Sequence, residues 1–177
     1  MSGVLQLSNI FFISDTHFGH KNLLNFKRDD GSHQRHYTSV EEMNADLIKN
    51  WNSVVGINDK VYHLGDLALQ VPNLDFMYEL KGKKILYKGN HDKLDISQYA
   101  KHFKDIRGAD HKGEFMFMLS HIPLHKMSIK LGFVNIHGHL HHKSLDDSSY
   151  FNVSVERINY TPIELGVLQE ILRACNH

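Results

Sequence analysis

Cysteine is nearly absent from this sequence, since Cys175 is the only one among 177 residues. A lone cysteine cannot form a disulfide within the chain, so nothing indicates an oxidising compartment. Thiolates are also too few to build a structural zinc site, which usually needs several of them.

Long apolar runs and an excess of one charge are missing as well. No run is long enough to cross a bilayer, and the N-terminus lacks the pattern of a signal peptide. Twenty basic and twenty acidic side chains cancel, so net charge indicates neither membrane nor nucleic acid as a partner. We expect a cytoplasmic protein without a membrane partner. A basic stretch from Lys21 to Arg35 leaves nucleic-acid binding open, and a homo-oligomer is equally compatible with the sequence.

The pattern of apolar residues predicts one α/β domain over residues 1–177, with no repeat and no linker. Short apolar runs predict strands at 9–14, 59–64, 84–88, 133–136 and 150–155. Turn residues at 110–113 predict a hairpin whose arms are 105–109 and 114–119.

Helix signals lie between these runs. Ser39 and Glu42 form a capping-box pattern, and a helical apolar face follows them. The residues predicted for that buried face are Val40, Met43, Leu47, Trp51 and Val54. Shorter helices are predicted at 72–80 and 96–103, and Thr161 with Pro162 predicts the start of a last helix.

Histidine is abundant, and its positions are informative. The chain has fifteen histidines, several of which lie in polar clusters directly after predicted strands. These clusters are Asp15-Thr16-His17, Gly65-Asp66, Gly89-Asn90-His91-Asp92, Ser120-His121 and Gly138-His139-Leu140-His141. Ligands of α/β sheets gather at the carboxyl ends of strands, so we expect the clusters to meet there.

The residue types in these clusters predict a metal centre. Carboxylate, imidazole and amide oxygen suit borderline divalent ions such as Mn²⁺, Fe²⁺ or Zn²⁺. Two aspartates, one asparagine and four histidines are too many for one ion with an open position. They suit two ions that share a bridging carboxylate. The glycines at 65, 89 and 138 are expected to allow the sharp turn before each ligand.

The ordered motifs D-x-H, G-D, G-N-H-D, S-H and G-H-x-H resemble the calcineurin-like metallophosphoesterase superfamily, from Asp15 to His141. The resemblance implies a four-layer αββα sandwich with two metal ions at the sheet ends. It implies that one ion is held by Asp15, His17, Asp66 and His141. The other would be held by Asp66, Asn90, His121 and His139, with Asp66 as the bridge.

The resemblance also implies a reaction. A hydroxide that bridges the metals would attack the phosphorus, His91 would protonate the leaving group as general acid, and Asp92 would orient His91. Manganese is the favoured cofactor, with iron, zinc, nickel, cobalt and magnesium as alternatives. Arg35 and Asn90 are the candidates for binding the substrate phosphate, because arginine binds phosphate through two parallel hydrogen bonds.

Differences between this sequence and one branch of the superfamily narrow the predicted substrate class. Leu67-Ala68-Leu69-Gln70 follows Asp66, whereas the protein-phosphatase branch has a phosphate-binding arginine there, so that branch is disfavoured. The chain looks like small bacterial and phage phosphoesterases. The first hypothesis is a phosphodiesterase acting on a small diester, nucleotide diesters included. The alternatives are a phosphomonoesterase and, from another class, a non-catalytic scaffold of the same fold.

Overall fold

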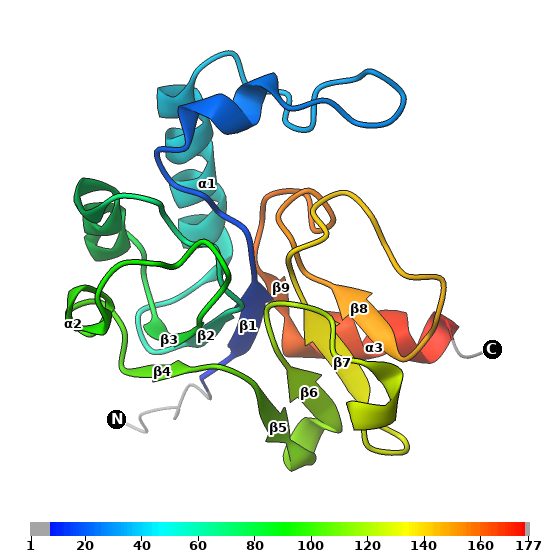
Figure 1. Cartoon of the computed structure of the whole chain (residues 1–177). Coiled ribbons are helices and arrows are strands. Elements are labelled where there is room, and N and C mark those ends of the chain that lie inside the picture. Colours follow the sequence, from blue (N-terminus) through cyan, green and yellow to red (C-terminus); the bar gives the residue numbers. More distant parts are fainter. Residues whose placement is uncertain (1–7, 176–177) are drawn as a thin grey trace.

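The computed structural model describes residues 8–175, so the predicted domain bounds, 1–177, extend beyond the described residues at both ends. Two β-sheets stand side by side, with helices around them (Figure 1). The predicted α/β class is confirmed, because strands and helices alternate through much of the chain. No helix within residues 8–175 is long and apolar enough to span a membrane.

The first sheet has five strands in the order β4-β3-β2-β1-β9. Its strands are β1 (Ile10–Ile13), β2 (Lys60–His63), β3 (Lys83–Tyr87), β4 (Asp105–Arg107) and β9 (Ile163–Glu164). The pairs β1–β2, β2–β3 and β3–β4 are parallel, and only β9 runs antiparallel to its neighbour β1. The carboxyl ends of β1, β2 and β3 therefore lie at the same edge.

The second sheet has the order β5-β6-β7-β8. Its strands are β5 (Asp110–Lys112), β6 (Phe117–Leu119), β7 (Val134–His137) and β8 (Tyr150–Asn152). Strands β6, β7 and β8 are parallel. Ser14, just after β1, donates its N–H to Val153 O at 2.9 Å, so the ends of β1 and β8 meet and join the two sheets.

The helices differ widely in length. The α-helices are α1 (Val40–Val54), α2 (Ile96–Tyr99) and α3 (Leu165–Cys175). The 3₁₀ helices are η1 (Lys21–Asn25), η2 (Val71–Tyr78), η3 (Gly113–Phe115) and η4 (Lys126–Ser128). The helix predicted at 72–80 is thus a 3₁₀ helix.

Helix α1 begins where the sequence predicts. Ser39 Oγ accepts the N–H of Glu42 at 3.1 Å, while the Glu42 carboxylate accepts the N–H and hydroxyl of Thr38. Trp51 and most of the predicted face are buried or partly buried. Val54 is 41% exposed, so the prediction that it belongs to the buried face was wrong. Val55, just past the helix end, is buried in its place.

The core divides into two hydrophobic clusters because successive side chains of a strand point to opposite faces. Phe11 and Ile13 of β1 join a cluster with Trp51 of α1, on one face of the first sheet. Phe12 joins the other cluster, which contains residues of both sheets, among them Phe117 of β6. The two sheets therefore share one apolar core, while α1 covers the far face of the first sheet.

The predicted hairpin at 105–119 was wrong in its pairing. β4 pairs with β3 in the first sheet, and β5 pairs antiparallel with β6 in the second, so the chain crosses between sheets at Gly108. The expected turn residues 110–112 form β5, and the turn is η3, closed by Met116 at φ 59°. Local apolar patterns do not reveal which sheet a strand enters.

The last helix begins later than predicted. Thr161 donates its hydroxyl to Asn159 O at 3.0 Å and does not cap a helix. Ile163 and Glu164 pair with β1 as β9, and α3 starts at Leu165. Pairing along the edge of β1 therefore replaces the first helical turn.

Candidate metal centre

Five loops meet where the two sheets join, and each follows the carboxyl end of a strand. Backbone hydrogen bonds connect them: Asp15 N–H donates to Gly65 O at 2.9 Å, and His17 N–H donates to Asp66 O at 3.0 Å. Gly138 N–H donates to His121 O at 2.9 Å, which connects the loops after β6 and β7. These bonds hold the predicted ligands of different strands together.

Six of the predicted ligands form two groups able to hold a metal ion. Asp15, His17 and His141 form one, which we call the first cluster. A second cluster consists of Asp66, His121 and His139. Within each cluster the candidate ligand atoms lie within 4.8 Å of one another.

Asp66 lies between the two clusters. Its Oδ2 is 3.6 Å from His17 Nε2 and 3.3 Å from His121 Nε2, so one carboxylate oxygen faces a histidine of each cluster. Its Oδ1 accepts the N–H of His91 at 2.8 Å. This is the placement that a bridging ligand requires.

Asn90, the seventh predicted ligand, lies at the second cluster. Its Oδ1 is 2.9 Å from His121 Nε2 and 3.0 Å from His139 Nδ1. His121 Nδ1 donates to Leu64 O at 2.7 Å, so in the neutral ring Nε2 carries a lone pair. That lone pair faces two oxygen acceptors, from Asn90 and Asp66, and a cation between them would satisfy all three.

The first cluster also contains buried atoms that lack a partner. Asp15 Oδ2 accepts the N–H of His139 at 2.9 Å and the hydroxyl of Ser154 at 2.8 Å. Asp15 Oδ1 and both ring nitrogens of His17 are buried and have no hydrogen-bond partner among the described residues. Because a buried polar atom without a partner is costly, these atoms fit a bound cation.

The charges of both clusters are shaped by burial. Burial, reinforced by Arg35, lowers the pKa of His17 well below its usual 6.5, which favours the neutral imidazole. Burial alone would raise the pKa of Asp66, but in the metal-free protein the hydrogen bond and charge of a protonated His121 ring, whose own pKa is raised, lower it to about 2. A cation bound at the second cluster would take the place of that proton. Neutral histidine and ionised aspartate are the forms that bind metals.

The ligand residues have an unusual backbone. Of the eight non-glycine residues with positive φ in the described chain, five are predicted ligands. They are Asp15 (59°), His17 (49°), Asp66 (55°), His139 (70°) and His141 (52°). Such conformations cost about 1–3 kcal/mol each and tend to gather at functional sites.

The glycines next to the ligands act in two ways. Gly65 has φ +94°, the turn that the sequence predicted. Gly89 and Gly138 are required for close approach instead: a Cβ on Gly138 would lie 1.9 Å from Ser14 Oγ, and one on Gly89 would lie 2.2 Å from Asp66 Oδ1.

His91 and Asp92 are neighbours in sequence but differ in their exposure to solvent. His91 is exposed at the mouth of the site, with its ring centroid 5.7 Å from that of His17. Asp92 is buried, and its two oxygens accept the backbone N–H groups of Asp66, Gly89 and Leu67 at 2.8–3.0 Å. The predicted role of Asp92 in orienting His91 does not agree with this placement, because its carboxylate secures the loops beneath Asp66.

The placement of Arg35 does not agree with its predicted role in binding the substrate. Its side chain is fully buried, donates from Nε to Glu156 Oε1 at 2.8 Å and from Nη1 to Thr16 O at 2.9 Å, and contacts Asp15 O through Nη2. A guanidinium bound on all sides by protein groups is not presented to a substrate phosphate. The substrate-binding role predicted for Arg35 is therefore corrected to a structural one beneath the first cluster.

Two residues at the site escaped the sequence analysis. Glu156 has a fully buried side chain and accepts both Arg35 Nε and His141 Nδ1, the latter at 3.1 Å. Burial would raise its pKa, yet Arg35 and His141 lower it to about 2. Ser154 binds Asp15, as described above. Both lie just after β8 and belong to none of the motifs.

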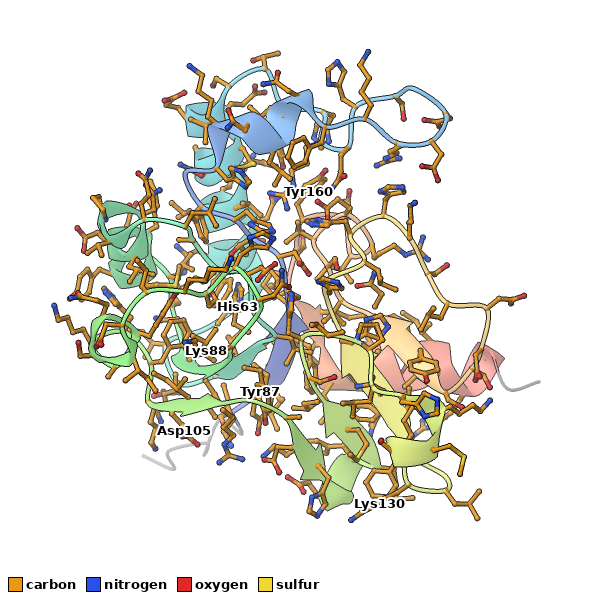
Figure 2. All side chains as sticks on the ribbon, in the orientation of Figure 1. His63, Tyr87, Lys88, Asp105, Lys130 and Tyr160 are labelled. Atoms are coloured by element: carbon orange, nitrogen blue, oxygen red, sulfur yellow. The ribbon has the colours of Figure 1, made fainter. Side chains whose placement is uncertain are left out.

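His63 is the last residue of β2 and is fully buried; it is labelled in Figure 2. Its Nε2 lies 3.0 Å from the hydroxyl of Thr16, the residue between Asp15 and His17. Burial lowers the pKa of His63 to about 3, so the ring is neutral near neutral pH.

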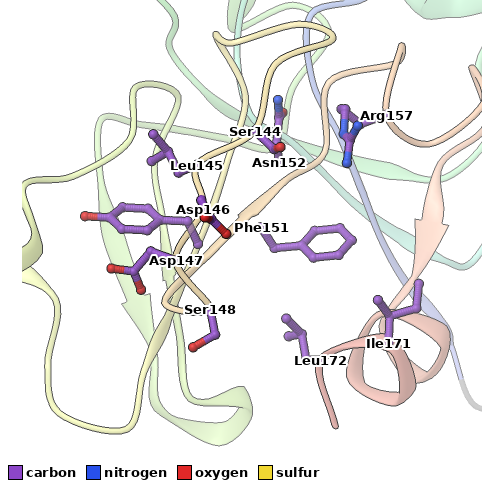
Figure 3. A pocket seen from close by; sticks show the side chains of 11 residues that line it. Ser144, Leu145, Asp146, Asp147, Ser148, Phe151, Asn152, Arg157, Ile171 and Leu172 are labelled. Atoms are coloured by element: carbon purple, nitrogen blue, oxygen red, sulfur yellow. The ribbon is translucent and has the colours of Figure 1, made fainter. Parts of the chain in front are cut away.

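A separate hollow of about 510 Å³ lies away from the clusters, between the loop 144–148 and α3 (Figure 3). Phe151, Ile171 and Leu172 line its apolar side, and Arg157 stands at its rim. None of the seven predicted ligands lines it, so its volume does not make it the place of the predicted chemistry.

The comparisons with known proteins give a family. The uncharacterized protein MJ1445 of Methanocaldococcus jannaschii is 35% identical over 179 residues, which cover 95% of this chain and 93% of that protein. The chain belongs to the same family as this archaeal protein. None of the protein-family models matches the chain.

Two further proteins are similar to this chain, and their names state no activity. The Gene 66 protein of Mycobacterium phage L5 is 40% identical over 93 residues, covering 49% of this chain and 41% of the phage protein. The crystal structure of a protein of unknown function, AQ665 from Aquifex aeolicus, matches with a TM-score of 0.72 and 26% identity. That match covers 93% of this chain and all of the other. The chemistry must therefore be argued from the site.

Proposed function

We propose that this chain is a dinuclear-metal phosphoesterase of the calcineurin-like metallophosphoesterase type, and that it acts as a phosphodiesterase on a small diester. The observation that supports this most is the position of Asp66 Oδ2, within 3.6 Å of a histidine of each cluster. Two ions that share a carboxylate suit phosphoester hydrolysis, because together they stabilise the attacking and leaving oxygens.

The donor set fits Mn²⁺ or a similar ion. The first ion would be held by Asp15, His17 and His141 and the second by Asn90, His121 and His139, with Asp66 shared. Bound there, the ions would act as Lewis acids on the phosphate and would lower the pKa of water. Asn90 is exposed beside the second cluster and is also available to a substrate oxygen.

His91 would act on the leaving group. Its backbone N–H is fixed by Asp66 at 2.8 Å, while its ring stays exposed at the mouth of the site. A protonated ring there can donate a proton to the leaving alkoxide, a contribution typically worth ~10²–10⁴-fold in rate.

The fold supports the same proposal. The two sheets share a hydrophobic cluster, and α1 covers the outer face of the first sheet. We propose that this arrangement is the four-layer αββα sandwich of the superfamily. The alternatives remain a phosphomonoesterase, which would use the same ligands, and a scaffold that binds metal without turnover.

The test is hydrolysis of two synthetic esters by chelator-stripped protein with added Mn²⁺. We expect bis-p-nitrophenyl phosphate to be cleaved faster than p-nitrophenyl phosphate, with no cleavage before Mn²⁺ is added. Glu114→Ala, a substitution far from both clusters in the η3 turn, serves as the matched control and should retain full activity.

Each outcome separates the alternatives. Faster cleavage of the monoester would favour a phosphomonoesterase. Tight binding of two ions without cleavage of either ester would favour a scaffold. Cleavage that persists fully in excess chelator would contradict the proposed function, because the ligand clusters would then have no part in it.

A further inference from the structure

A buried ion pair lies directly beneath the first cluster, and residues 8–175 contain no counterpart of it at the second. Glu156 and Arg35 are 121 residues apart in sequence, and the side chains of both are 0% exposed. Such a pair is costly to bury unless every partner is satisfied, so its presence needs a reason beyond stability.

The pair contacts two of the three ligands of the first cluster, His141 and Asp15, and also the backbone of Thr16. Glu156 Oε1 accepts His141 Nδ1–H at 3.1 Å, which leaves Nε2 of that ring as the nitrogen available to a metal. Arg35 donates to the backbone carbonyls of Thr16 and Asp15, and so fixes the strained segment that carries Asp15 and His17.

The histidines of the second cluster have different hydrogen-bond partners. His121 Nδ1 donates to a backbone carbonyl, Leu64 O, and the His139 ring faces the neutral amide of Asn90. No carboxylate orients either histidine through its far nitrogen in the described part of the chain. Carboxylate partners of this kind raise the basicity of a ligand histidine and its metal affinity.

We propose that Glu156 and Arg35 are positioning residues of the first metal site, which orient its ligands and make it the tighter of the two sites. This inference rests on the proposed function, since it presupposes two metal ions. It predicts ordered loading: the first cluster fills at low metal concentration and the second only at higher concentration.

Calorimetric titration of chelator-stripped protein with Mn²⁺ tests the inference without any substrate. Wild-type protein should show two separate binding events. Glu156→Ala should weaken the tighter event by about 10–100-fold, as loss of an outer partner typically does, and leave the weaker event unchanged. Glu156→Gln, which keeps the size and one acceptor, should weaken the same event less.

Asp59→Ala is the matched control. Asp59 is also a buried carboxylate, 9% exposed, but it binds the backbone N–H groups of Asn9 and Gly56 at the opposite end of β2. Its removal should lower the melting temperature without changing either Mn²⁺ affinity. Circular dichroism establishes which variants are folded. If Glu156→Ala does not fold, the titration of Glu156→Gln tests the inference in its place.

The outcomes are distinct. Two unchanged affinities in a folded Glu156 variant would overturn the positioning role while leaving the proposed function intact. Equal weakening of both events, matched by Asp59→Ala, would also overturn it, because the effect would then be general destabilisation. Absence of Mn²⁺ binding by the wild-type protein would overturn the proposed function itself.

Discussion

The two clusters have similar ligands and different surroundings. Each contains one aspartate and two histidines, and each lies at the carboxyl ends of parallel strands. The first rests on the buried Arg35–Glu156 pair, whereas the second includes exposed Asn90 and lies beside His91. If the proposed dinuclear centre forms, this difference predicts a firmly held ion at the first cluster and a more accessible ion, next to the substrate, at the second.

Asp66→Asn should have the largest effect, because Asp66 faces both clusters. Loss of its charge should weaken the binding of both ions and remove the difference in affinity between the two sites. Since bound metals supply several kcal/mol of transition-state stabilisation, we expect kcat/KM to fall by roughly 10³-fold or more. Steady-state kinetics and metal analysis on the same sample would test this. Full activity with two bound ions would refute the bridging role.

His91→Ala should leave both clusters intact and slow the reaction. The missing proton transfer predicts a fall in kcat of ~10²–10⁴-fold with unchanged Mn²⁺ content. A substrate with a good leaving group should be less affected than one with a poor leaving group, because it needs less protonation. Loss of metal in this variant would show instead that His91 is a ligand.

Asn90→Ala should affect the second cluster and spare the first, since Asn90 contacts both histidines of the second. We expect the weaker Mn²⁺ binding event to lose about tenfold or more in affinity, and the tighter event to remain. Calorimetric titration beside Glu156→Ala gives the comparison directly. Equal effects of the two variants on the same binding event would remove the distinction between the sites.

His63→Gln should affect stability in a pH-dependent way. The pKa of His63 is lowered from 6.5 to about 3 by burial and by the charge of His121, so between these values only the unfolded chain takes up the proton. The free energy of unfolding of the wild type should therefore fall as pH drops below 6.5, by about 1.4 kcal/mol per pH unit from this group.

Urea unfolding of metal-free protein at pH 7 and pH 5 checks the prediction. The glutamine variant should be less stable at pH 7, because the contact with Thr16 changes. The gap between the two proteins should narrow by about 2 kcal/mol at pH 5. An equal gap at both pH values would mean that His63 is not buried in its neutral form.

The meeting of the candidate ligands could be predicted from the sequence, because each follows a short apolar strand and the carboxyl ends of parallel strands lie at one edge of a sheet. Glu156 could not, because it belongs to no motif and its meaning depends on Arg35, far away in the chain. Asp92 shows a different error: the resemblance implied that it orients His91, but its carboxylate accepts backbone amides instead.

The pairing of β4 and β5 could not be predicted from the sequence either, for a related reason. Ile106 is the one apolar residue of β4, and β5 has none, so the apolar pattern reveals neither β5 nor the sheet that each of these strands joins. Arg107, at the end of β4, binds Asp105 at 2.7 Å and also contacts Asp110 of β5, and these contacts accompany the crossing between sheets. Long-range pairing of this kind is decided by the packed structure and not by local pattern.

The most direct test of the dinuclear proposal is the number of Mn²⁺ ions bound per chain, measured together with diester hydrolysis as metal is added stepwise. We predict two ions per chain, with hydrolysis appearing as the second ion binds. Saturation at one ion per chain, or full hydrolysis with only one ion bound, would contradict a dinuclear centre.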